Sequence, residues 1–199
     1  MGAMTSQHEL RDVLLALLPD QGGWAEEDYL WVSEKTNRPL EFTDGYIEVL
    51  PMPTSKHQAS LRVLFLAFFG YLQPRGGNVL FAPLRLRLRP GKFREPDLLA
   101  LLDADDPRYR DRYWLGADLV AEVVSADNPE RDLIEKRREY AETGIPEYWI
   151  ANPLHETIAV LRLQEGVYVE HGVFARGELA TSALLPGFGV EVDAVFDAK

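Results

Sequence analysis

The stretch ADLVAEVVSADNPERDLIEKRREY, residues 117–140, contains a carboxylate in an otherwise apolar setting. Residues 118–124 have the composition of a buried β-strand, and Glu122 lies within it. An unpaired ionised carboxylate in an apolar interior costs several kcal/mol, or it becomes neutral through a raised pKa. The sequence therefore predicts that another group compensates Glu122.

A helix is predicted directly after this strand. Asn128, Pro129 and Glu130 form a typical helix start, with an N-cap residue, then proline, then an acidic residue in the first turn. The helix is expected to run to about Thr143 and to end at Gly144 in the left-handed conformation.

One stripe of this helix carries Asp132, Lys136 and Tyr140, which are four residues apart. The early turns can lie over the same sheet edge as Glu122, where Lys136 could orient a water molecule or stabilise charge on a phosphate. The alternative is an ordinary surface ion pair between Asp132 and Lys136, worth a few tenths of a kcal/mol.

The remaining segments predict an α/β fold with a mixed central sheet flanked by helices. We divide the chain into an N-terminal helical extension, residues 1–38, and a single domain, residues 39–199. Residues 1–3 precede a second methionine and are interpreted as a cloning remnant. Helices are expected at 6–18, 25–34 and 55–73, strands at 96–102 and 147–152, a later hairpin around Glu165-Gly166, and a tail of short strands and loops.

A β-hairpin is predicted at residues 40–50, because Asp44-Gly45 separates two alternating runs. In that register Phe42 faces Ile47, and Glu41 faces Glu48. Two opposed glutamates repel each other. Either solvent exposure resolves this repulsion, or a bound cation or an arginine lies nearby.

Composition excludes several classes of site. The chain of 199 residues has no cysteine, so disulfides, thiolate zinc sites and thiol nucleophiles are excluded. Neither a membrane-spanning apolar run nor a signal-peptide pattern is found, and a cytoplasmic location is expected. The net charge of −11 argues against broad electrostatic attraction to nucleic acid.

A local basic strip contrasts with this acidic chain. Arg85, Arg87 and Arg89 alternate with leucines, so they would share one face of a half-buried strand. They could grip a nucleic-acid backbone. Equally, they could pair with neighbouring acidic side chains.

Asp97 opens the strand at 96–102 and is the natural partner of Glu122 at a sheet edge. Converging carboxylates need positive charge between them to stay ionised. Magnesium binds one or two carboxylates and keeps waters for phosphate oxygens. The pair therefore predicts a divalent-cation site.

Together these residues resemble the Uma family of restriction endonucleases, small members of the PD-(D/E)XK nuclease superfamily. The resemblance covers about residues 39–190. Its motifs are Glu41-x-x-Asp44-Gly45, His57, Pro96-Asp97, Glu122-Val123-Val124-Ser125, Arg131-Asp132, Lys136, Tyr140 and Gly144-Ile145-Pro146-Glu147-Tyr148-Trp149.

The resemblance implies a restriction-endonuclease-like core and a set of roles. Asp97 and Glu122 would bind Mg²⁺ or Mn²⁺ with the Val123 carbonyl. The superfamily lysine normally stands where this chain has Val124, and Lys136 from the next helix matches the place from which the family supplies it.

Further residues have weaker roles by the same resemblance. Glu41 would be an additional acid near the metal, and Asp132 would support Lys136. His57 is either a site residue or a helix cap or packing residue. Asn152 stands before proline where the family usually has aspartate, a departure we interpret as structural.

Three functions remain open from the sequence. The first is a metal-dependent endonuclease that hydrolyses DNA, for which a homodimer would be natural. The second is a catalytically inactive interaction or dimer module on the same fold. The third is a metal-dependent hydrolase of a small phosphorylated molecule, which suits the acidic surface. No organic cofactor and no membrane partner are expected.

Overall fold

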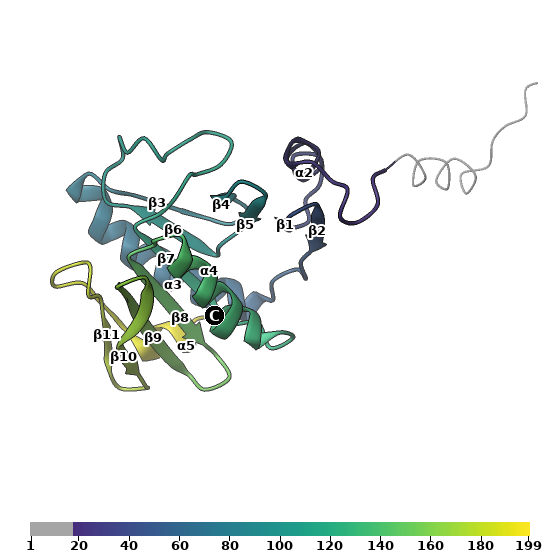
Figure 1. Cartoon of the computed structure of the whole chain (residues 1–199). Coiled ribbons are helices and arrows are strands. Elements are labelled where there is room, and N and C mark those ends of the chain that lie inside the picture. Colours follow the sequence, from purple (N-terminus) through teal and green to yellow (C-terminus); the bar gives the residue numbers. More distant parts are fainter. Residues whose placement is uncertain (1–17) are drawn as a thin grey trace, which may run out of the picture.

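The fold was analysed in a computed structural model that describes residues 18–199 (Figure 1). The helix predicted at residues 6–18 lies, except for its last residue, outside the described part. The helices of the described part are α2 (Glu26–Ser33), α3 (Ser55–Leu72), η1 (Gln73–Arg75), η2 (Arg131–Glu135), α4 (Lys136–Glu142) and α5 (Val192–Phe196). Across residues 18–199, none of these helices combines the length and the apolar character needed to cross a membrane.

A mixed sheet of six strands forms the centre, as predicted. Its order is β10-β9-β8-β7-β6-β3, and only β7 and β8 pair in parallel. Its strands are β3 (Asn78–Phe81), β6 (Leu98–Leu101), β7 (Leu119–Val123), β8 (Glu147–Asn152), β9 (Thr157–Gln164) and β10 (Val167–Phe174).

Helices cover both faces of this sheet because β8 presents large side chains alternately to each side. Trp149 meets Phe68 of α3 edge to face at 5.2 Å on one side. Tyr148 meets Tyr140 of α4 edge to face, also at 5.2 Å, on the other side. Such pairs add to the stability that area burial provides. The β-strands β11 (Leu179–Thr181) and β12 (Gly189–Glu191) and the helix α5 complete the α3 side. Helix α5 was not predicted.

A second sheet, which the sequence did not predict, has the order β2-β1-β5-β4. It contains the predicted hairpin in its predicted register, with Glu41 opposite Glu48. Asp44 and Gly45 have φ angles of 48° and 89°, as a tight turn between twisted strands requires. Its strands are β1 (Leu40–Thr43), β2 (Tyr46–Val49), β4 (Leu86–Arg89) and β5 (Lys92–Arg94).

The predicted helix α2 belongs to the core of this second sheet. Tyr29 stacks on Phe42 at 5.2 Å and lies at the same distance from Phe93. Figure 1 shows α2 and the hairpin together on one side of the central sheet. The boundary that we predicted after residue 38 stays a prediction.

The helix after β7 is confirmed with one difference. Residues 131–135 form the π-helical stretch η2, which continues directly into α4. Gly144 ends the helix with a φ of 80°, as predicted. Short π turns are frequent at functional sites.

A second buried carboxylate, Glu147 at the start of β8, is satisfied without any cation. It accepts hydrogen bonds from Trp149 Nε1 and Ser182 Oγ at 2.7 and 2.6 Å. The backbone amides of Ala183 and Leu184 donate to its other oxygen, both at 2.7 Å. Glu147 therefore fastens the loop before β12 to the central sheet.

We expect Glu147→Gln to lower the free energy of unfolding by about 2–4 kcal/mol, because the NH2 group that replaces one carboxylate oxygen cannot accept hydrogen bonds from the two buried donors facing it. Urea denaturation followed by circular dichroism measures this change. Glu170→Gln on the exposed part of β10 is the matched control, with an expected change within about 0.5 kcal/mol. Equal stability of the two variants would contradict the assignment.

Candidate active site

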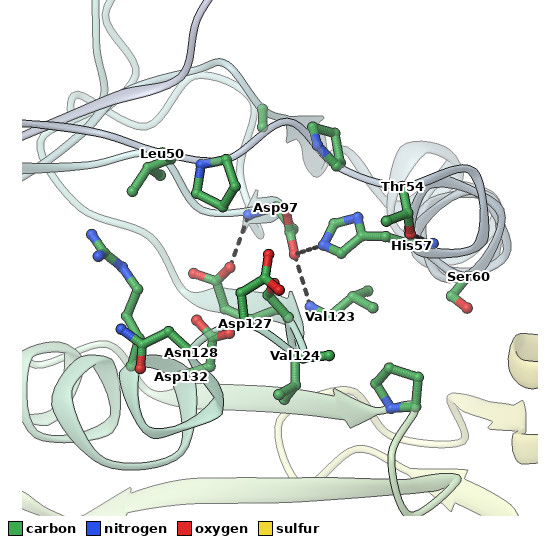
Figure 2. Close-up of a pocket in the computed structure, with 18 of the residues that line it drawn as sticks. Leu50, Thr54, His57, Ser60, Asp97, Val123, Val124, Asp127, Asn128 and Asp132 are labelled. Carbon is green, nitrogen blue, oxygen red and sulfur yellow. Dashed lines mark hydrogen bonds and ion pairs between the residues drawn. The ribbon is translucent and has the colours of Figure 1, made fainter.

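The site begins where β6 and β7 run antiparallel. Asp97 precedes β6 and Glu122 lies near the end of β7, so both residues reach the same edge of the sheet. The Asp97 amide donates to Glu122 Oε2 at 3.3 Å, and the Val123 amide donates to Asp97 Oδ2 at 2.8 Å (Figure 2). The expected meeting of these two acids is confirmed, while their chemical roles stay predictions.

Lys136 compensates Glu122. Its Nζ lies 2.8 Å from Glu122 Oε1 and 3.0 Å from Asp132 Oδ1. The Tyr140 hydroxyl donates to the same Glu122 oxygen at 2.7 Å. Glu122 is 2% exposed, and Asp132 and Lys136 are each 5% exposed. The alternative of a surface pair between Asp132 and Lys136 is therefore wrong.

Carboxyl groups outnumber permanent cations around Lys136. Burial raises the pKa of Glu122 to about 8; the Lys136 charge opposes this shift, and the charges of Asp97 and Asp132 add to it. Burial works against the charged form of Lys136, but the charges of Glu122 and Asp132 raise its pKa above the usual range. Additional positive charge would stabilise Glu122 in its ionised form.

His57 joins the site from the first turn of α3. Thr54, not His57, caps this helix, and its Oγ1 accepts the His57 amide at 3.2 Å. The His57 Nε2 lies 3.0 Å from Asp97 Oδ2. Figure 2 shows the two side chains pointing toward each other. Burial opposes protonation, but the hydrogen bond and charge of Asp97 raise the pKa of His57.

Glu41 is connected to the site through Arg131, the residue before Asp132. It is fully buried, and Arg131 and Arg94 neutralise it; Arg94 Nη1 lies 3.3 Å from Glu41 Oε2. Arg131 also binds Glu48, the residue opposite Glu41 in the hairpin. The sequence left open whether solvent exposure or a nearby positive charge relieves the repulsion between these glutamates. Arg131 supplies that positive charge.

The predicted arginine strip is engaged elsewhere. Arg87 pairs with Glu26 of α2 at 2.8 Å, and Arg89 pairs with Asp44 of the hairpin turn at 2.6 Å. Arg85 donates to the Arg112 carbonyl at 3.2 Å. Among residues 18–199, these three arginines are not part of the cavity that contains Asp97 and Glu122. The predicted alternative, in which the arginines pair with acidic side chains, is therefore confirmed for Arg87 and Arg89.

A cavity of about 390 Å³ opens over the two acids. Arg131, Asp132 and Lys136 line it on the helix side, and His57 and Lys56 line it on the α3 side. An apolar rim surrounds the polar floor and includes Leu50, Pro51, Met52, Pro53, Pro153 and Leu154.

Glu95 and Arg131 also line the cavity; Glu95 was not predicted from the sequence, and Arg131 was named there only within a family motif and without a role. The burial of Glu95 raises its pKa to about 8, and its Oε2 accepts the Leu40 amide at 3.3 Å. The spacing of Glu95 could have predicted this position. Residues i and i+2 of an extended chain point to the same side, and Glu95 precedes Asp97 by two residues.

The donor set fits a divalent cation that keeps part of its water shell. No group of three or more histidine, aspartate or glutamate side chains suited to hold a metal occurs within the described residues. However, when Glu122 is ionised, the three carboxylates of Asp97, Glu122 and Asp132 outnumber the permanent positive charge of Lys136, so a bound cation and the ionised form of Glu122 would stabilise each other. Magnesium typically takes one or two carboxylates and retains waters, so Asp97 and Glu122 fit this ion.

The fold and the acidic site together define a protein of the restriction-endonuclease-like class. The family described as "Putative restriction endonuclease", Uma2, matches residues 25–193, and the chain belongs to this family. No curated protein matches the sequence.

One similar solved structure is described as a "putative nuclease belonging to DUF820" from Anabaena variabilis. It superposes with a TM-score of 0.68 at 20% identity, over 84% of this chain and 97% of that one. At this identity the likeness shows the fold.

Glu95→Gln tests the electrostatics of the cavity. The pKa of Glu95 is raised to about 8 from its usual 4.5, so folded protein keeps a proton that the unfolded chain loses. The wild-type free energy of unfolding should therefore decrease as pH rises from about 5 to about 8. In the variant we expect this decrease to be smaller by on the order of 1–3 kcal/mol.

Urea denaturation of both proteins at several pH values measures this difference. The exposed Glu170→Gln should keep the wild-type pH dependence. If Glu95→Gln also keeps it, the raised pKa is refuted.

Proposed function

We propose that this chain is a metal-dependent endonuclease that hydrolyses DNA phosphodiester bonds. The observation that carries the proposal is the meeting of Asp97 and Glu122 in one cavity, with Lys136 2.8 Å from Glu122. Membership of a restriction-endonuclease-like family supports the reaction class.

Asp97 and Glu122, helped by the Val123 carbonyl, would hold Mg²⁺ or Mn²⁺. Such an ion neutralises charge on the phosphate and lowers the pKa of a bound water. Two carboxylates at the cavity floor leave room for the waters and phosphate oxygens that complete the coordination of a hard cation.

Lys136 would align the attacking water or stabilise charge on the phosphate. Asp132 and Glu122 hold its ammonium from two sides, at 3.0 and 2.8 Å, so its position is defined before substrate binds. Tyr140 fixes the Glu122 carboxylate through a 2.7 Å hydrogen bond. His57, 3.0 Å from Asp97, would orient that carboxylate in the same way.

Glu41 is proposed as a positioning residue, because it is fully buried and neutralised by two arginines. For Arg85, Arg87 and Arg89, binding of a DNA backbone would require Arg87 and Arg89 to exchange their carboxylate partners for phosphates. A homodimer would let two such sites cut both strands of a duplex.

We expect Glu122→Gln to reduce Mn²⁺- or Mg²⁺-dependent plasmid cleavage by roughly 100-fold or more, because the amide removes a negative charge at the reacting centre. Gel electrophoresis of supercoiled plasmid measures the rate. Glu142→Gln, exposed on α4, should cleave at the wild-type rate. Wild-type cleavage by purified Glu122→Gln would refute the proposal.

Hydrolysis of a small phosphorylated molecule is the second candidate. The limited cavity volume of about 390 Å³ and the net charge of −11 favour it. Assays of bis(p-nitrophenyl) phosphate and plasmid side by side, with Mn²⁺, discriminate the two. For an endonuclease we expect cleavage of the plasmid with at most slow turnover of the small ester; the reverse would favour the second candidate.

Calorimetric titration with Mn²⁺ distinguishes the two candidate enzymatic functions from a catalytically inactive interaction module. We expect the wild type to bind Mn²⁺ and Asp97→Ala to bind it at least roughly 10-fold more weakly. A wild type that takes up no metal would favour the module.

A further inference from the structure

Arg131 occupies an unusual position between the hairpin and the cavity. It lines the cavity beside Asp132 and Lys136, and its guanidinium contacts the two glutamates that face each other across the hairpin. Nη2 donates to Glu41 and Nη1 donates to Glu48. Its Nε is buried and has no hydrogen-bond partner in the part of the chain that the structure describes.

The two partners of Arg131 differ in accessibility. The Glu41 side chain is fully buried, whereas the Glu48 side chain is 57% exposed. The exposed carboxylate of Glu48 is solvated when it leaves Arg131, whereas separating Arg131 from Glu41 would leave an uncompensated buried charge. An incoming anion can therefore replace Glu48 while Glu41 keeps the guanidinium in place.

The other cations of the cavity are less suited to this exchange. Lys136 is 5% exposed and lies between Glu122 and Asp132. Lys56 is exposed and lies at the α3 side of the opening. Arginine presents five N–H donors in a planar fork that matches phosphate oxygens, so Arg131 can bind a phosphate with donors that Glu41 does not use.

We infer that Arg131 anchors a phosphate of the substrate next to the acidic site, and that Glu48 occupies the guanidinium until the phosphate displaces it. The inference rests on the proposed function, since it takes a nucleic-acid strand as the ligand. Glu41 acts as a positioning residue. The two opposed glutamates thus have different roles, one holding Arg131 and one competing with the substrate.

Binding of a fluorescein-labelled phosphorothioate single-stranded oligodeoxynucleotide, measured by anisotropy in Ca²⁺, tests the inference. For Arg131→Met we expect Kd to rise by roughly 10-fold. The slope of log Kd against log salt concentration should also fall by about 0.7, the value for one lost phosphate contact on a single strand. A purely structural role would leave the slope unchanged.

Glu48→Gln gives an independent readout that does not depend on a buried residue. We expect its Kd to decrease by about 2–5-fold because the competitor for Arg131 loses its charge. Arg138→Met and Glu142→Gln, an exposed pair 3.7 Å apart on α4, are the matched controls and should change Kd less than about 2-fold.

Three results would overturn the inference. They are an unchanged salt slope for folded Arg131→Met, a Kd for Glu48→Gln that is unchanged or higher, and a wild type that binds no oligonucleotide. A wild type that binds the oligonucleotide but does not cleave plasmid with Mn²⁺ would refute the proposed function and leave this inference standing.

Discussion

The interaction between Glu122 and Lys136 is the constraint on which the site depends. Removing a carboxylate and an ammonium from water is expensive, and good geometry with further hydrogen bonds is needed to offset it. Tyr140 and Asp132 supply those bonds. The pair also joins β7 to the helix that follows it, so the requirement to neutralise one buried acid fixes that helix over the sheet edge.

A second charged network attaches the smaller sheet to the same helix. It is balanced, with three cations and three carboxylates, whereas the group around Glu122 has more carboxyl groups than permanent cations. The network consists of Lys92, Glu139, Arg94, Glu41, Arg131 and Glu48. Arg131 and Asp132 are sequence neighbours, so the balanced and the unbalanced group meet at the start of the helix. The balanced network can hold the smaller sheet against the helix, and the carboxyl groups around Glu122 can bind an additional cation.

Local sequence patterns predicted much of this arrangement, because each such pattern involves residues that are close together in the sequence. The Asp44-Gly45 turn determined the hairpin register, and the spacing of Asp132, Lys136 and Tyr140 determined a shared helix face. The same patterns could not give the partners of the arginine strip, because Arg87 meets Glu26 across 61 residues. The second sheet and the burial of Glu95 likewise depend on long-range packing, which periodicity does not encode.

The π-helical stretch at residues 131–135 sets a limit on how this chain can change in length. Successive residues of an α-helix are turned by about 100° around its axis. Loss of one residue between Arg131 and Lys136 would therefore turn Arg131 by about 100° away from the hairpin while Lys136 kept its place. The contacts of Arg131 with the hairpin and of Lys136 with Glu122 therefore depend together on the number of residues that separate them.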